Sequence, residues 1–173
     1  EWVKQGVRHA VIAPGSRSTP LALALTNRSE IHIEVFHDER SAAFAALGVG
    51  LAIQQPAILL CTSGTAAAHF YAAIIEADLS HVPMLIVTAD RPPELKDVGA
   101  PQTIDQTKMY GDRVRWFHDP GVPSRDLRNR LKFLEHCHNA GIIPDVEWEG
   151  ICRAVREQQD RRQAANRKSA HHH

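Results

Sequence analysis

The sequence lacks most of the features that mark a special environment. Its 173 residues include only three cysteines, Cys61, Cys137 and Cys152, without the spacing of a metal site, so we expect reduced thiols. No apolar run approaches the roughly 20 residues that a membrane-spanning helix needs. Residues 1–4 contain neither a charged leader nor an apolar signal core. We therefore expect a cytoplasmic protein without a membrane span.

An excess of charge is also missing, because 20 Lys and Arg residues balance 20 Asp and Glu residues. A zero net charge gives no reason to expect nucleic acid or an acidic membrane as a partner. Small anions stay open as ligands, since local clusters of Arg can bind them. With 43% hydrophobic residues, a chain of this length is expected to form one well-cored domain.

Residues 9–93 alternate between short runs rich in Val and Ile and longer segments rich in Ala and Leu. The first kind predicts strands, most of them buried on both faces, and the second kind predicts helices. Their alternation predicts an α/β fold with a mainly parallel sheet and helices on both faces. We expect strands at 9–13, 31–36, 57–61 and 83–89, and helices at 19–26, 38–54 and 65–79.

The pattern changes after Val122. Leu residues at helical spacing predict an amphipathic helix at 124–139, and apolar residues within 148–155 predict another. From Arg156 onward the chain is almost wholly polar, as in a solvated tail. We therefore divide the sequence into a domain at 1–122 and a helical extension with a polar tail at 123–173.

The first unusual loop, at 14–20, follows the first expected strand, and ligands of parallel sheets bind where strands end. It contains Ser16 and Arg17 between glycine and proline, just before a helix. Backbone donors and one guanidinium predict a cradle for a carboxylate or a phosphate. A capped turn with a solvated Arg17 is the alternative.

The second loop ends with Asp38 and Glu39 at the start of the second helix. Asp38 is well placed to cap the first turn. Glu39 has two interpretations: it complements the helix dipole, or it is a buried carboxyl able to hold or pass a proton. The apolar strand before it and the Ala-rich helix after it favour burial.

Two further loops follow the third and fourth strands. Thr62, Ser63, Gly64 and Thr65 offer backbone and hydroxyl groups to a ligand, but Ser63 lacks the glycine of a hydrolase nucleophile turn. Arg91 precedes two prolines that stiffen its loop, and it either clamps a carboxylate or pairs with a nearby acid. His136, Cys137 and His138 do not predict a metal site, because adjacent helical residues diverge by about 100°.

Taken together, these loops resemble one enzyme family. Residues 4–120, approximately, are similar to the N-terminal pyrimidine-binding domain of 2-succinyl-5-enolpyruvyl-6-hydroxy-3-cyclohexene-1-carboxylate synthases. These thiamine-diphosphate enzymes of menaquinone biosynthesis join 2-oxoglutarate to isochorismate with loss of carbon dioxide. The matching stretches are APGSRSTPL at 13–21, FHDERSAAFAALG at 36–48, TSGTA at 62–66, TADRPPEL at 88–95, and Gly99 to Gln102 with Gln106.

The resemblance implies a role for each of these loops. Glu39 would be the catalytic carboxyl that hydrogen-bonds the aminopyrimidine ring of the cofactor and favours its imino tautomer. The Thr62 to Thr65 loop would lie near the same ring. Contacts to the anionic substrates would come from Ser16, Arg17, Arg91 and Gln102.

The sequence also departs from this family. We find no acidic motif for the Mg²⁺ or Mn²⁺ that holds the diphosphate, which in the family belongs to a separate domain. We therefore expect this chain to supply half of the site, to be inactive alone, and to form a homo-oligomer. Another thiamine-diphosphate decarboxylase or synthase, and a non-catalytic fragment or assembly module of this fold, stay open as alternatives.

Overall fold

The computed structural model describes residues 2–121 together with Glu135, Glu149 and Arg153. The chain divides into two units, residues 1–117 and residues 118–173. The first unit contains the sheet and its helices. The helices expected at 124–139 and 148–155 lie outside the described residues apart from those three positions, and the boundary expected at 122 stays a prediction.

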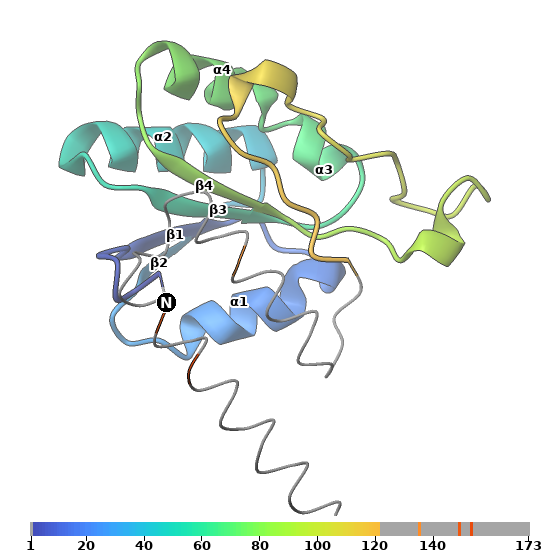
Figure 1. The fold of residues 1–173 in the computed structure, drawn as a ribbon, viewed down its shortest axis with the longest axis horizontal. Coiled ribbons are helices and arrows are strands. Elements are labelled where there is room, and N and C mark those ends of the chain that lie inside the picture. The colour runs from blue at the N-terminus through green and yellow to red at the C-terminus, as the bar shows by residue number, and fades with distance from the viewer. Residues whose placement is uncertain (1, 122–134, 136–148, 150–152, 154–173) are drawn as a thin grey trace, which may run out of the picture. The chain divides into compact units, whose positions relative to one another are not determined.

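A four-stranded parallel sheet forms the centre of the first unit (Figure 1). Its strands are β1 (His9–Ile12), β2 (His32–Val35), β3 (Ala57–Cys61) and β4 (Met84–Thr88), in the spatial order β2-β1-β3-β4. All three pairings are parallel. The expected α/β class is confirmed, and each strand lies within one or two residues of its expected bounds.

Helices cover both faces of this sheet (Figure 1). The long helices are α1 (Thr19–Thr26), α2 (Glu39–Ile53) and α4 (Tyr71–Leu79), with a short α3 (Thr65–Ala68) before α4. Single 3-10 turns occur at Ser16–Ser18, Pro93–Leu95 and Gly111–Arg113. No described helix has the length and apolarity needed to cross a bilayer.

Side chains alternate along the inner strands and thereby build two cores. Val11, Leu59 and Cys61 point toward α2 and α4, where Phe70 is fully buried. Their neighbours in sequence, including Ile58 and Leu60, point toward the α1 side, where Leu25 joins them. Burying such side chains contributes roughly 1.5–3 kcal/mol each, so β1 and β3 anchor the domain.

The outer strands are less buried than the sequence predicted. All five residues of β4 are partly exposed, and His32 and Val35 of β2 are exposed. The reason is their place in the sheet, because each outer strand pairs with a neighbour on one side only.

The prediction of one continuous helix at 65–79 was wrong, because the helix is broken between α3 and α4. The Ala67 carbonyl accepts from the Phe70 amide at 3.2 Å and from the Tyr110 hydroxyl at 2.9 Å. In a continuous helix this carbonyl would accept from residue 71 instead. The tighter turn directs Phe70 into the core.

Candidate functional site

The carboxyl ends of the four parallel strands lie along one edge of the sheet, on the right in Figure 1, where α1 and α3 also begin. Every candidate site residue lies in a loop or a helix start that follows one of these strands. The order of the strands reverses direction between β1 and β3, since β2 lies beyond β1 and β4 lies beyond β3. Such a reversal is where ligands of open α/β sheets bind.

The loops after β1 and β3 touch at this point. A Cβ placed on Gly15 would lie 2.4 Å from the Thr62 Cβ, so only glycine permits the contact. The Gly15 carbonyl accepts from the hydroxyls of Ser18 at 3.0 Å and Thr19 at 3.3 Å, which fixes the turn. The Thr62 hydroxyl is buried and has no hydrogen-bond partner within the described part of the chain.

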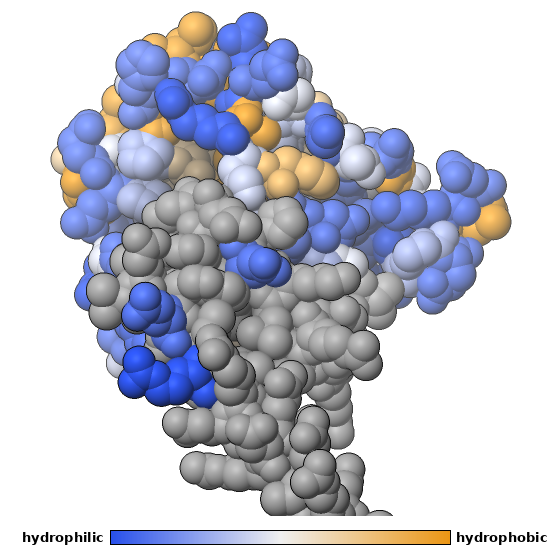
Figure 2. All heavy atoms as spheres, in the orientation of Figure 1, coloured by the Kyte–Doolittle hydropathy of each residue, from blue (hydrophilic) through white to orange (hydrophobic). Residues whose placement is uncertain are grey.

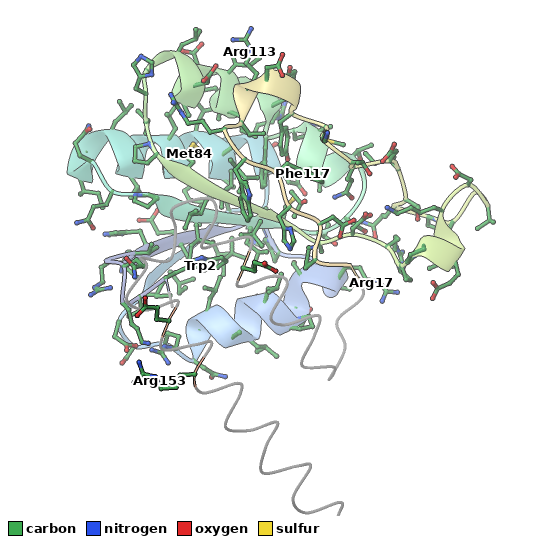
Figure 3. All side chains as sticks on the ribbon, viewed as in Figure 1. Trp2, Arg17, Met84, Arg113, Phe117 and Arg153 are labelled. Atoms are coloured by element: carbon green, nitrogen blue, oxygen red, sulfur yellow. The ribbon has the colours of Figure 1, made fainter. Side chains whose placement is uncertain are left out.

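Ser16 and Arg17 lie in the turn that this bonding creates. Both are exposed, and Arg17 lies in the 3-10 turn just before α1, on the side of the sheet where the strands end (Figure 3). The turn therefore presents a guanidinium and a hydroxyl to solvent beside the Gly15–Thr62 contact. Such groups suit a carboxylate or a phosphate.

Glu39 is the first residue of α2, and its place is set by the residues on either side. Asp38 caps the helix by accepting from the amides of Arg40 at 2.9 Å and Ser41 at 3.1 Å. The Arg40 guanidinium also donates to both Asp38 carboxylate oxygens, at 3.2 and 2.7 Å. These interactions, the Arg40 side chain first, hold the pKa of Asp38 well below its usual value.

Glu39 itself is only partly buried, less than the sequence led us to expect. The strand that precedes it, β2, is an outer strand, and it leaves Val35 57% exposed. The carboxyl is close enough to the end of β3 to act on Cys61. Burial raises the pKa of the Cys61 thiol to about 12, and the negative charge of Glu39 adds to this shift.

The segment after β4 extends beyond the sheet as an arm, defined here as residues 90–105 (Figure 1). Arg91 ties the two ends of the arm together, since its Nη2 donates to the Pro101 carbonyl at 2.9 Å. Asp90 accepts from the Arg91 amide at 2.7 Å and pairs with Lys96 at 2.9 Å. Gln102 comes directly after Pro101, is exposed and has a left-handed backbone conformation (φ 54°).

The arm returns to the loop after β3. The Ser63 hydroxyl donates to the Gln102 carbonyl at 3.0 Å. Gly64 has a φ of +83°, and a Cβ there would lie 2.9 Å from the Gln102 carbonyl carbon. The structure thus joins Ser63, Gly64, Gln102 and, through Pro101, Arg91, whereas Thr65 is exposed at the start of α3.

Sequence reasoning missed the residue that holds this junction, Gln106. It is 8% exposed, and its Oε1 accepts from the Gly64 amide at 2.8 Å. A buried N–H without a partner costs about 1–3 kcal/mol, so this acceptor matters to the loop. Its only signal in the sequence was its place at the end of the family resemblance, with no role attached.

Metal ligands do not gather at this edge. Within residues 2–121 and the three further described positions, no three His, Cys, Asp or Glu side chains are placed to hold one ion. The triplet His136, Cys137 and His138 lies outside the described residues.

Comparison with known proteins identifies the family. Residues 1–109 match the model of the thiamine pyrophosphate enzyme N-terminal TPP binding domain. The chain is 56% identical over 135 residues to a 2-succinyl-5-enolpyruvyl-6-hydroxy-3-cyclohexene-1-carboxylate synthase of Bacillus pumilus, covering 78% of this chain and 23% of the relative. It is 48% identical over 147 residues to the enzyme of that name from Oceanobacillus iheyensis, covering 82% and 25%.

A third relative of that name, from Thermobifida fusca, is 54% identical over 126 residues, or 73% of this chain and 23% of the relative. The chain therefore spans about a quarter of the length of the curated relatives that it matches. The matched residues include the loops after all four strands. The chain belongs to the thiamine pyrophosphate enzyme family, as an N-terminal TPP binding domain like that of the 2-succinyl-5-enolpyruvyl-6-hydroxy-3-cyclohexene-1-carboxylate synthases.

Proposed function

We propose that this chain supplies the aminopyrimidine-activating half of a thiamine-diphosphate site that joins decarboxylated 2-oxoglutarate to isochorismate in menaquinone biosynthesis. The observation that carries the proposal is the junction at the reversal of strand order. There Gly15 packs against Thr62 and Gly64 packs against Gln102, and the buried Thr62 hydroxyl has no partner among the described residues. The half-buried Glu39 is close enough to act on Cys61, the neighbour of Thr62. The names of the relatives supply the substrates.

The residues present fit thiamine diphosphate, which is the same compound as thiamine pyrophosphate. Gly15 and Gly64 let the loops after β1 and β3 and the segment at Gln102 pack closely, so that the groups proposed to contact the ring lie near one another. The buried Thr62 hydroxyl still has bonding capacity within the described residues. The Glu39 carboxyl would hold a proton at the ring nitrogen. When bound, the cofactor supplies a stabilised carbanion equivalent for decarboxylation and carbon–carbon bond formation.

Two guanidiniums, those of Arg17 and Arg91, would bind the substrates, both of which are anions. Arg17 projects from the turn after β1, and Arg91 belongs to the arm that carries Gln102. A guanidinium binds a carboxylate through two parallel hydrogen bonds, which orients the substrate as well as attracting it. Ser16 and Gln102 would add neutral donors beside these charges.

The remaining parts of the site lie outside this chain in the proposal. A diphosphate-binding domain of the same enzyme would hold the diphosphate together with Mg²⁺ or Mn²⁺, in a cytoplasmic homo-oligomer. The support for the further domain is the length of the relatives, of which this chain spans about a quarter. The chain alone is then expected to show no turnover.

The test is a chimera in which residues of this chain replace the matching ones of the Bacillus pumilus enzyme. Consumption of isochorismate is measured with 2-oxoglutarate, thiamine diphosphate and Mg²⁺ present. We expect turnover by the chimera, and a loss of about 10²–10⁴-fold in kcat when Glu39→Gln removes the acidic proton while keeping the shape.

Two controls sharpen this experiment. The chimera should bind thiamine diphosphate with or without the Glu39→Gln change, which separates lost chemistry from lost assembly. Pyruvate in place of 2-oxoglutarate should give no product, which separates this enzyme from other thiamine-diphosphate synthases. Full activity of the Glu39→Gln chimera would sink the proposed role of Glu39.

A further inference from the structure

Few polar side chains are buried within the described residues, and Gln106 has the most extensive bonding among them. Its Oε1 accepts from the Gly64 amide at 2.8 Å. Its Nε2 donates to the Ala89 carbonyl at 3.0 Å and to the Thr88 hydroxyl at 3.3 Å. One amide therefore joins the loop after β3 to the end of β4.

Gln106 acts together with a second bond four residues earlier in the chain. Ser63 donates to the Gln102 carbonyl, while its neighbour Gly64 donates to the Gln106 side chain. We call these two bonds the clasp. Because they arise from adjacent residues and end on one short segment, they fix the direction of that segment as well as its position.

The clasp joins the two kinds of residue that the proposed function requires. On one side is the loop from Thr62 to Thr65, proposed to lie near the cofactor ring. On the other side is Gln102, and through the Arg91 bond to Pro101 the clasp also reaches a guanidinium proposed to bind substrate. Gly64 keeps the two sides in contact, since its missing Cβ would collide with the Gln102 backbone.

We propose that Gln106 is a positioning residue, whose buried amide sets the distance between the cofactor loop and the substrate-binding residues Gln102 and Arg91. This inference rests on the proposed function for the identity of those ligands. The amide acts through Gly64 and the end of β4 without touching substrate. Its effect should therefore appear in substrate binding more than in the chemical step.

The first test uses the chain as it is and does not depend on activity. Amide hydrogen exchange is followed at Gly64 in the wild type, in Gln106→Met, which keeps the length of the side chain, and in Thr88→Val. We expect Gln106→Met to speed exchange at Gly64 at least tenfold, with β1 and α2 unchanged. Thr88→Val, which removes only the longest bond, should stay within twofold of the wild type.

The second test uses the chimera described above. Gln106→Met should raise the KM for 2-oxoglutarate about tenfold and lower kcat less than threefold, with Thr88→Val close to the wild type. If the wild-type chimera has no turnover, the proposed function fails, whereas the exchange experiment still decides the clasp.

Should Gln106→Met not fold, Ser63→Ala tests the other bond of the clasp. It removes a single buried hydroxyl, and it should speed exchange at Gly64 and raise the same KM. Unchanged exchange in Gln106→Met and Ser63→Ala, or a kcat loss without a KM change, would overturn the role of Gln106 as a positioning residue.

Discussion

Among single residues, Cys61 has the most direct chemical consequence. Its thiol is fully buried at the end of β3, and burial together with the charge of Glu39 raises its pKa to about 12. Only the thiolate reacts with alkylating reagents, so at pH 8 roughly one thiol in 10⁴ is reactive, against about a quarter for an ordinary cysteine. We expect iodoacetamide to label Cys61 at least a hundredfold more slowly in the native chain than in urea.

Mass spectrometry of the peptide that contains Cys61 measures this rate. Glu39→Gln serves as the control, because it removes the smaller cause of the shift and leaves burial, the larger one, in place. Labelling should then remain slow. Equal rates in native and unfolded chains would show that the end of β3 is open to solvent.

At the scale of residues, the sequence predicted which edge of the sheet carries the polar loops better than it predicted the hydrogen bonds within them. The expectation that polar residues follow each strand placed Thr62 and Arg91 at the edge where β3 and β4 end. Burial of Glu39 was overestimated, because the sequence does not reveal that β2 is an outer strand. Gln106 had no signal of its own, since a buried glutamine in a loop has neither periodicity nor a motif.

Among the elements, the first turn of α2 leads us to predict how the stability of the fold depends on pH. The folded state lowers the pKa of Asp38 below its unfolded value of about 3.9, so the resulting stability is present above that value. It is lost as the pH falls through the folded pKa. Asp38→Asn keeps a capping oxygen but removes the ion pair with Arg40. We expect a lower melting temperature at pH 6 and a smaller difference from the wild type below pH 4.

The comparison is made by thermal unfolding followed by circular dichroism. Asp119→Asn is a suitable control, because Asp119 bonds only a local turn amide at Gly121 among the described contacts. A difference between wild type and Asp38→Asn that grows as the pH falls would contradict the assignment of the lowered pKa to the folded state.

The elements also show where sequence patterns stop being informative. Strand positions followed from Val and Ile runs, and the 19–26 helix was expected with its observed bounds. The break between α3 and α4 was not, because it depends on Tyr110 bonding to the Ala67 carbonyl across 43 residues. Local propensity carries no information about such a distant donor.

At the scale of the whole molecule, the outer face of α2 is the surface that we expect to promote self-association. Phe44 is 47% exposed and Leu51 is 50% exposed, and Gly48 lies exposed between them at helical spacing. Figure 2 shows apolar patches among the polar surface of the layer formed by α2 and α4. With no net charge to repel another copy, such a stripe favours association.

We therefore expect the chain to associate as its concentration rises, which sedimentation velocity detects as an increasing sedimentation coefficient. The double change Phe44→Ser and Leu51→Ser should abolish this increase, because it removes the apolar stripe without touching the core. Leu23→Ser is the matched control, since Leu23 is 58% exposed but lies on α1. If Leu23→Ser reduces association as strongly as the double change, non-specific contacts between exposed apolar residues explain the association, and α2 is not the interface. A constant coefficient for the wild type would refute association altogether.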